Sequence, residues 1–270
     1  MLFNATNLNV DTLCEMVAKL PQNTVAPGTN AALSISNGKG KIERLQSGTI
    51  VVTNVTSDFN MKNNLFKLNN IEAIAYGGKV VGNATYNMLY SNTNINLQGR
   101  NLNAQTAMYG CTGIKNLING TLNFDAFNFT TRGLTEIQIM KSLNGTVNFI
   151  VSNGQMGTLG KLENLLYAQN ILANNILKTT LGTIIGAVKV KKTGDFKYIN
   201  GTVKLSNGWA NLDKIQISGS AMSMYIKGKY NILNNNANLI ILGRVSDEVV
   251  SVLGPIGSFS VNSLIASIPK

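Results

Sequence analysis

The chain has 270 residues, of which 44% are hydrophobic, and its 23 Lys and Arg against 12 Asp and Glu give a formal net charge of +11. This composition excludes a disordered chain and allows a substantial core in one elongated domain or two ordinary ones. The basic residues are scattered, without the interleaved aromatic residues typical of nucleic-acid binding, so no nucleic-acid partner is predicted.

The chain begins with MLFNATNLNVDTLCEMV, which has neither the basic start nor the uninterrupted apolar run of a signal peptide. No later apolar stretch is long and continuous enough to predict a membrane span. Residues 11–20 carry apolar residues at helical spacing and are followed by Pro21, so they predict a short helix.

The commonest local pattern further along is a short alternating run, then Asn-Gly, then another run, as in LINGTLNF and YINGTVKLSNGWANL. Asn and Gly accept the left-handed backbone that a type I′ turn needs at both central positions, so each pair predicts a hairpin turn. The resulting series of strands and tight turns favours an antiparallel meander over a βαβ fold. The six Asn-Gly pairs begin at Asn37, Asn119, Asn144, Asn153, Asn200 and Asn207.

Strict alternation assigns side chains to faces of these strands. In one run Leu122 and Ala126 are in phase, but Phe127 and Phe129 have the other parity, which predicts a bulge or turn. Two other runs each place three apolar residues on one face: Val147, Phe149 and Val151 in TVNFIV, and Met222, Met224 and Ile226 in AMSMYIKGKYNI.

Three later segments have helical patterns. Residues 134–143 form one candidate, residues 159–178 carry the longest apolar stripe, and Ser246 is placed to cap a helix through Leu253. We expect these helices to cover one face of the sheet, with the longest within residues 158–178. A membrane-surface helix is the alternative interpretation of that segment.

Residues for catalysis are scarce. The chain has no histidine, which removes the commonest general base and most zinc sites. Among its acids only Asp247 and Glu248 are adjacent, and the two cysteines form no CxxC pair. The sequence therefore predicts no catalytic, cofactor-binding or metal residue, and no enzymatic activity.

Four segments together resemble the AsmA-like family, the AsmA, TamB and YhdP type envelope proteins of bacteria with two membranes. They are NLNVDTLCEMVAKLP; the strands that lead into YGGKVVG; LTEIQIMKSLNGTVNFIVSNGQMGTLGKLENLL; and the run from FKYINGTVKLSNGWANL to NLIILG. They occur in family order between about residue 7 and residue 261. The whole chain, residues 1–270, is then a single elongated region from the carboxy-terminal part of a longer protein whose membrane anchor is absent.

The resemblance implies a mainly β fold, a long curved antiparallel sheet that forms an open trough with an apolar interior. It also implies a periplasmic location, inner-membrane anchoring of the full-length protein, and a role in carrying phospholipid or supporting outer-membrane assembly. Strands that are apolar on both faces, such as NLIILG, agree with a trough, although a two-sheet sandwich remains the alternative. The candidate lipid-lining residues are Val147, Phe149, Val151, Met222, Met224, Ile226, Leu239 and Ile241.

The expected partners are phospholipid or another acyl lipid, and a membrane. A structural or adhesive β-rich surface module is the alternative function.

Overall fold

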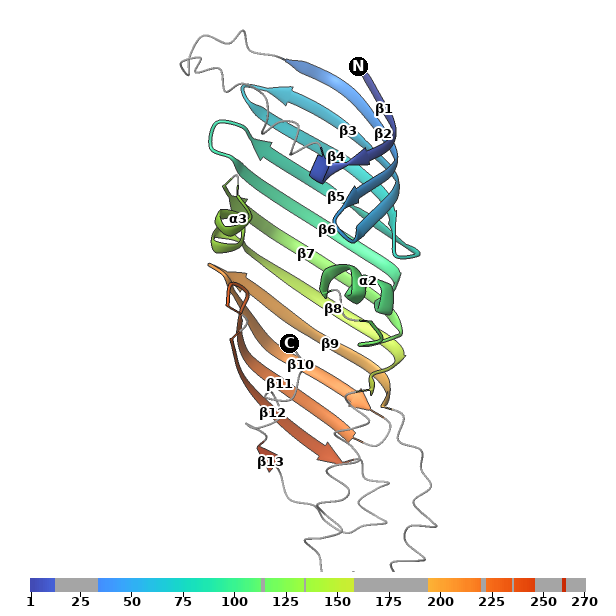
Figure 1. Cartoon of the computed structure of the whole chain (residues 1–270), viewed down its shortest axis with the longest axis vertical. Helices are drawn as coiled ribbons and strands as arrows, with labels where there is room; N and C mark the ends of the chain where they lie inside the picture. Colours follow the sequence, from blue (N-terminus) through green and yellow to red (C-terminus); the bar gives the residue numbers. More distant parts are fainter. Residues whose placement is uncertain are drawn as a thin grey trace, which may run out of the picture.

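A computed structural model describes residues 1–12, 34–112, 115–133, 135–157, 194–219, 222–234, 236–245 and 259–260. These residues form one sheet of 13 strands in which spatial order follows sequence order from β1 to β13 (Figure 1). The strands are β1 (Leu2–Asn9), β2 (Ile35–Ser47), β3 (Ile50–Lys62), β4 (Leu65–Ala75), β5 (Gly78–Asn87), β6 (Asn92–Asn103), β7 (Thr121–Arg132), β8 (Asn144–Gln155), β9 (Asp195–Ser206), β10 (Trp209–Gly219), β11 (Met222–Asn231), β12 (Ala237–Val245) and β13 (Phe259–Ser260).

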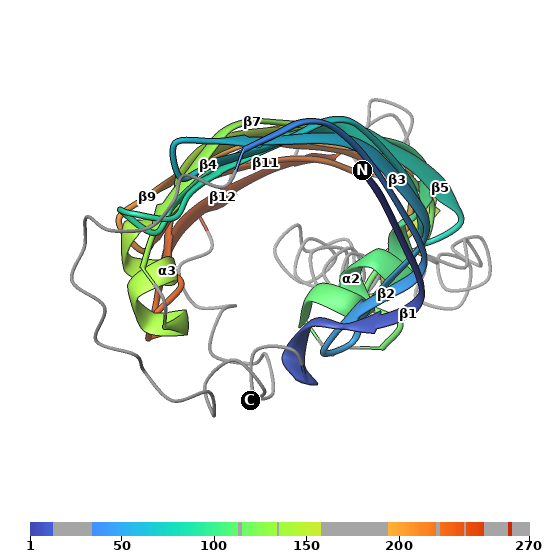
Figure 2. The same cartoon turned by 90° about the horizontal axis from the view of Figure 1, so that it is seen from above.

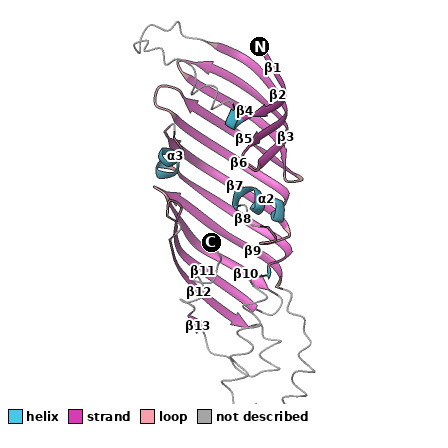
Figure 3. Ribbon diagram, viewed as in Figure 1, coloured by secondary structure: helices cyan, strands magenta, loops and turns pink. Residues whose placement is uncertain are grey.

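The sheet curves into an open trough and does not close into a barrel, as the view along its long axis shows (Figure 2). All neighbours from β2 to β13 pair antiparallel, whereas β1 pairs parallel with β2. Strands dominate the described residues (Figure 3). The predicted mainly β meander is therefore confirmed, and the alternative of a two-sheet sandwich is wrong.

Two short helices, α2 (Ala104–Thr112) and α3 (Glu136–Ser142), lie in the connections on either side of β7. Both lie within the curve, near opposite edges of the trough (Figure 2). Of the helices expected to cover one face of the sheet, α3 therefore lies at an edge, on the inner side.

The helix predicted over residues 134–143 is confirmed as α3, whose first turn carries a capping box. Thr135 accepts a hydrogen bond from the backbone N–H of Gln138, and the Gln138 side chain accepts one from the N–H of Thr135. The sequence did not predict α2. Of the segment 11–20 only residues 11 and 12 are described, at a helical position, and the helices predicted over 159–178 and 246–253 lie outside the described residues.

The Asn-Gly pairs are hairpin turns at only one of six positions, so the other five predictions are wrong. Asn207 and Gly208 join β9 to β10 with φ of 50° and 79°, as a type I′ turn requires. Three of the remaining pairs lie within strands, Asn144-Gly145 opens β8, and Asn119-Gly120 lies just before β7. Among the described turns, the other two-residue turns of this kind are Asn63-Asn64 and Tyr76-Gly77.

Asparagine has a second use, in bulges inside the strands. Asn54, Asn70, Asn101, Asn128 and Asn153 all have φ between 51° and 58°, one in each of five strands. Each lies at a register shift of its strand or close to the end of the ladder. Asn128 lies at the bulge predicted because Phe127 and Phe129 depart from the parity of Leu122 and Ala126. Because bulges bend the strand that carries them, this row contributes to the curvature of the trough.

Two of these bulges are completed by side chains of neighbouring strands. The N–H of Asn101 donates to Oδ1 of Asn123 over 2.7 Å, and the N–H of Asn128 donates to Oδ1 of Asn96 over 2.8 Å. A bulge removes its residue from the regular ladder, so these amide oxygens satisfy donors that the bulge displaces.

Glycines on the inner face make room for large side chains of the next strand. A Cβ at Gly38 would overlap the ring of Phe59, and one at Gly99 would overlap the ring of Phe124. Gly154 faces Phe196 in the same way. The glycines of two predicted hairpin turns, Gly38 and Gly154, are thus positions where an aromatic ring covers the backbone.

Candidate functional site: the apolar concave face

The concave face of the trough is built from rows of apolar side chains that run across the strands. Register pairs define three such rows from β7 to β12. The first contains Leu122, Val151, Ile199, Ile217 and Met224; the second Phe124, Phe149, Gly201, Ile215, Ile226 and Ile241; the third Ala126, Val147, Val203, Leu212, Gly228 and Leu239.

All eight candidate lining residues fall on this one face. Seven of them belong to the three rows, and Met222 shares their face because it precedes Met224 by two positions in β11. Val147, Phe149 and Val151 come from β8, and the other five from β11 and β12, so the register brings together residues nearly 100 positions apart. The side chains of Met222 and Ile241 lie outside the described part of the structure.

Burial divides the six candidate residues with described side chains into two groups. Val151 and Met224 are 6% and 5% exposed and belong to a packed cluster with Ile199, Ile215 and Ile217. Val147, Phe149, Ile226 and Leu239 are only partly buried. Apolar surface available to a ligand is therefore greatest in the second and third rows.

The connection that carries α2 contributes to the burial of the first row. Ala104, at the start of α2, and Ile118, before β7, belong to the same buried cluster as Val151. Ala104 also donates its N–H to the carbonyl of Gly120. This connection therefore packs over part of the first row, and the second and third rows are the more open part of the concave face.

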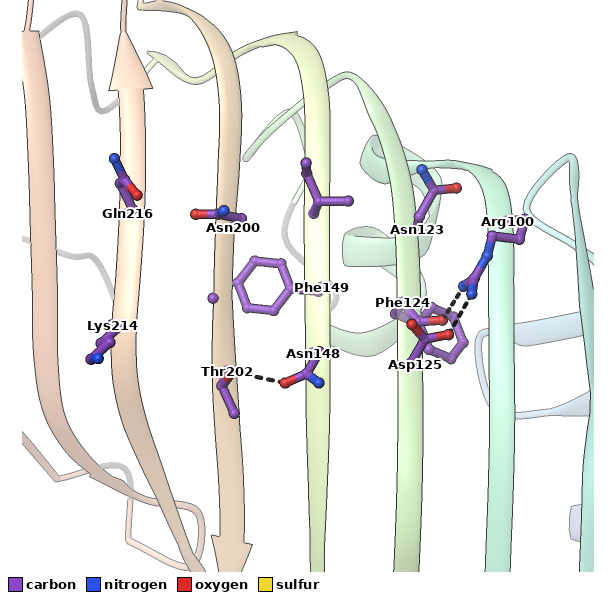
Figure 4. A pocket seen from close by; sticks show the side chains of 12 residues that line it. Arg100, Asn123, Phe124, Asp125, Asn148, Phe149, Asn200, Thr202, Lys214 and Gln216 are labelled. Atoms are coloured by element: carbon purple, nitrogen blue, oxygen red, sulfur yellow. Dashed lines mark hydrogen bonds and ion pairs between the residues drawn. The ribbon is translucent and has the colours of Figure 1, made fainter.

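The convex face has the opposite character. A shallow depression of about 630 Å³ across β6 to β10 is lined mainly by polar side chains, including Arg100, Asp125, Asn148, Thr202 and Gln216 (Figure 4). Arg100 pairs with Asp125 over 2.5 Å, and Thr202 donates to Asn148 over 2.7 Å. The described residues contain no group of three His, Cys, Asp or Glu side chains placed to hold a metal ion.

Sequence reasoning missed the lining residues of β7, β9 and β10. On β10 the alternation is broken by a bulge at Lys214, where φ is 53°, so Leu212 and Ile215 lie on one face despite their opposite parity. A lysine in a left-handed conformation has no sequence signal. The aromatic residues of β7, by contrast, were visible as an alternating run.

Comparisons with protein-family models, with curated proteins and with solved structures found no match. Among the described helices, none has the length and apolarity needed to cross a membrane.

Proposed function

We propose that the chain is a non-enzymatic, lipid-handling protein of the cell envelope whose concave face shields acyl chains of phospholipid. The observation that carries the proposal is the convergence of eight residues, chosen as lipid-lining from the sequence, on the concave face of one open sheet. The AsmA-like resemblance supports the same function and, with it, a periplasmic location and a part in transport of lipid between membranes or in outer-membrane assembly.

The dimensions of the rows support an acyl ligand. From β7 to β12 there are five inter-strand steps of about 4.8 Å, so a row extends roughly 24 Å. The hydrocarbon core of a bilayer is about 30 Å thick, which gives each tail a length of roughly 15 Å. One row is therefore long enough to cover a complete tail.

The energetics of burial support retention of such a ligand. Burial of each methylene contributes about 0.8 kcal/mol, so partial coverage of one tail by the second and third rows holds lipid through purification. The rows carry no charged side chain, and an acyl chain needs no polar partner. On the convex face, exposed apolar side chains such as Ile150 and Ile240 lie next to polar or charged residues, Asn200 and Lys227, and do not form continuous rows.

Native mass spectrometry of the chain purified from cells tests the proposal. Wild type should carry phospholipid, and Val147→Asp should lose it, because the carboxylate would lie on the half-buried third row. Ile150→Asp is the matched control: Ile150 lies on the same strand, is 36% exposed and faces the convex side. Circular dichroism establishes that both variants fold.

Lipid-free wild type would contradict the proposal and favour a structural or adhesive β-module. Equal lipid loss from Val147→Asp and Ile150→Asp would show that the concave rows are not the binding surface.

A further inference from the structure

One edge of the trough carries a row of exposed apolar side chains. They lie on three connections of this edge: the β5–β6 turn, α3, and the β11–β12 turn (Figure 1, left edge). Their exposed fractions range from 38% to 62%. We call this set the apolar rim: Met88, Leu89, Tyr90, Ile137, Ile139 and Leu233.

Backbone hydrogen bonds hold the connections of this edge next to one another. Gly133, just before α3, donates its N–H to the carbonyl of Ser91 in the β5–β6 turn. Ile232, in the β11–β12 turn, donates to the carbonyl of Gly208 in the β9–β10 turn. The rim is thus continuous with the ends of the strands and is fixed in position by the sheet.

The charges that flank the rim are mostly positive. Lys62, Arg132, Lys141 and Lys229 are exposed at the strand ends and on α3. The one acidic residue in the connections of this edge is Glu136, which opens α3. Lys229 lies with Nζ 4.9 Å from the ring centre of Trp209, the first residue after the β9–β10 turn.

The opposite edge differs in charge. It also exposes apolar side chains, Ile50 and Ile74, but acidic groups accompany them. Asp11 accepts hydrogen bonds from Ser47 and Gly48 at the β2–β3 turn, and Glu72 pairs with Lys79 over 2.9 Å. Among the described residues, excess positive charge next to exposed apolar side chains therefore distinguishes the apolar rim from the opposite edge.

We propose that the apolar rim docks on the surface of an anionic phospholipid bilayer. The apolar side chains of the rim enter the membrane–water interface, and Tyr90 and Trp209 lie at the level of the lipid headgroups. The flanking Lys and Arg side chains contact the negatively charged membrane surface. The inference stands on residues outside the lipid-lining rows and does not require that those rows hold lipid. Together, lipid binding by the concave rows and docking by the apolar rim would place one edge of the trough against a membrane.

The spacing of the tips favours a bilayer over a protein partner. The β5–β6 turn and α3 are separated by two inter-strand steps, about 10 Å, and α3 and the β11–β12 turn by four, about 19 Å. The tips therefore form separate projections from the edge, whereas the core of a protein interface is one closely packed apolar patch. A fluid interface accommodates separate projections without a matching shape.

Trp209 gives a direct measurement, because it is the chain's single tryptophan and lies at this edge. Full-length chain is mixed with vesicles of phosphatidylcholine alone or with phosphatidylglycerol added, each containing lipids brominated close to the headgroup. We expect quenching of Trp209 emission and co-flotation with the anionic vesicles only. Absence of flotation with anionic vesicles, or flotation without quenching, would overturn the proposal.

Two pairs of substitutions test which edge of the trough binds the vesicles. Leu89→Asp combined with Ile137→Asp should lower flotation at least tenfold. Ile50→Asp combined with Ile74→Asp changes two apolar side chains that are 41% and 40% exposed at the other edge, and it should leave flotation within twofold of wild type. Equal loss from both pairs would overturn the assignment to the rim.

Because the rim pair is exposed, it should retain the wild-type circular dichroism spectrum. If the rim pair does not fold, the double variant Lys141→Glu, Lys229→Glu is used in its place. This charge reversal should weaken binding to anionic vesicles at least fivefold, and unchanged binding would overturn the assignment to the rim. The same variants test the proposed lipid binding independently of membrane docking. Val147→Asp should lose co-purified lipid yet still float with anionic vesicles, and the rim pair should keep its co-purified lipid.

Discussion

At the scale of single residues, the left-handed positions inside the strands set where the sheet bends. Five of them are asparagines, whose side chain tolerates this conformation, but the bulge of β10 uses Lys214 at φ 53°. No described hydrogen bond involves the Lys214 side chain, and its position on the convex face is exposed. This site therefore retains a backbone cost that the other bulges reduce.

Lys214→Asn should stabilise the protein by about 0.5–1 kcal/mol, because asparagine adopts the left-handed conformation at a lower cost than lysine. Urea unfolding measures the change. Lys227→Asn is the control, since Lys227 is exposed on β11 without a positive φ and its replacement should be close to neutral. A destabilised Lys214→Asn would mean that the lysine side chain contributes more than its backbone conformation costs.

Individual residues of the strands also show which features of the fold could be predicted from the sequence. Alternation correctly placed Val147, Phe149 and Val151 on one face, because a buried face repeats every second residue. Asn-Gly failed at five of six sites, because a turn and a bulge both need a left-handed residue and the dipeptide does not distinguish them. Asn153-Gly154 fulfils that need inside β8, where the predicted turn would have ended the strand.

At the scale of elements, α3 depends on its first turn. The helix has seven residues, too few to be stable alone, and its capping box joins Thr135 to Gln138. At its other end, Ser142 Oγ accepts from the N–H of Arg132 over 2.7 Å, which ties the helix to the end of β7.

Thr135→Ala should cost about 1 kcal/mol of stability by removing the N-cap, whereas Thr135→Ser should cost little because its hydroxyl can still accept the Gln138 N–H. Thermal or urea unfolding measures both. Since α3 carries Ile137 and Ile139, Thr135→Ala should also weaken quenching of Trp209 by vesicles. Identical stabilities of the Ala and Ser variants would show that the cap does not support α3.

The contrast between the two helices explains why one was predicted and the other missed. The segment of α3 begins with a Thr three residues before a Gln, a capping pattern that is readable from sequence. The segment of α2, AQTAMYGCT, contains small and polar residues without an apolar stripe. Its buried residues, Ala104 and Ala107, pack closely because they are small, and that packing is a property of the tertiary structure.

At the scale of the whole molecule, the described sheet has two edges. β1 pairs with β2 alone, and β12 pairs with β13 at only two positions, Leu242 and Gly243. Leu2 and Phe3 on β1 are exposed. Long exposed edges with apolar side chains promote pairing between molecules.

Wild type should therefore self-associate as its concentration rises, and Leu2→Lys combined with Phe3→Lys should shift it towards monomer, because edge lysines disfavour strand addition. Size-exclusion chromatography with light scattering measures both. A wild type that stays monomeric at all concentrations would mean that its edges are protected.

The correspondence between spatial and sequence order has a consequence for assembly and evolution. Each strand from β2 onward pairs with its immediate predecessor, so the sheet can grow in the order in which the ribosome releases it, without waiting for a distant partner. Duplication of one hairpin would extend the trough by about 10 Å and leave all other pairings intact. The length of the trough is therefore a heritable quantity that changes by whole hairpins, as in repeat proteins, independently of the chemistry of its lining.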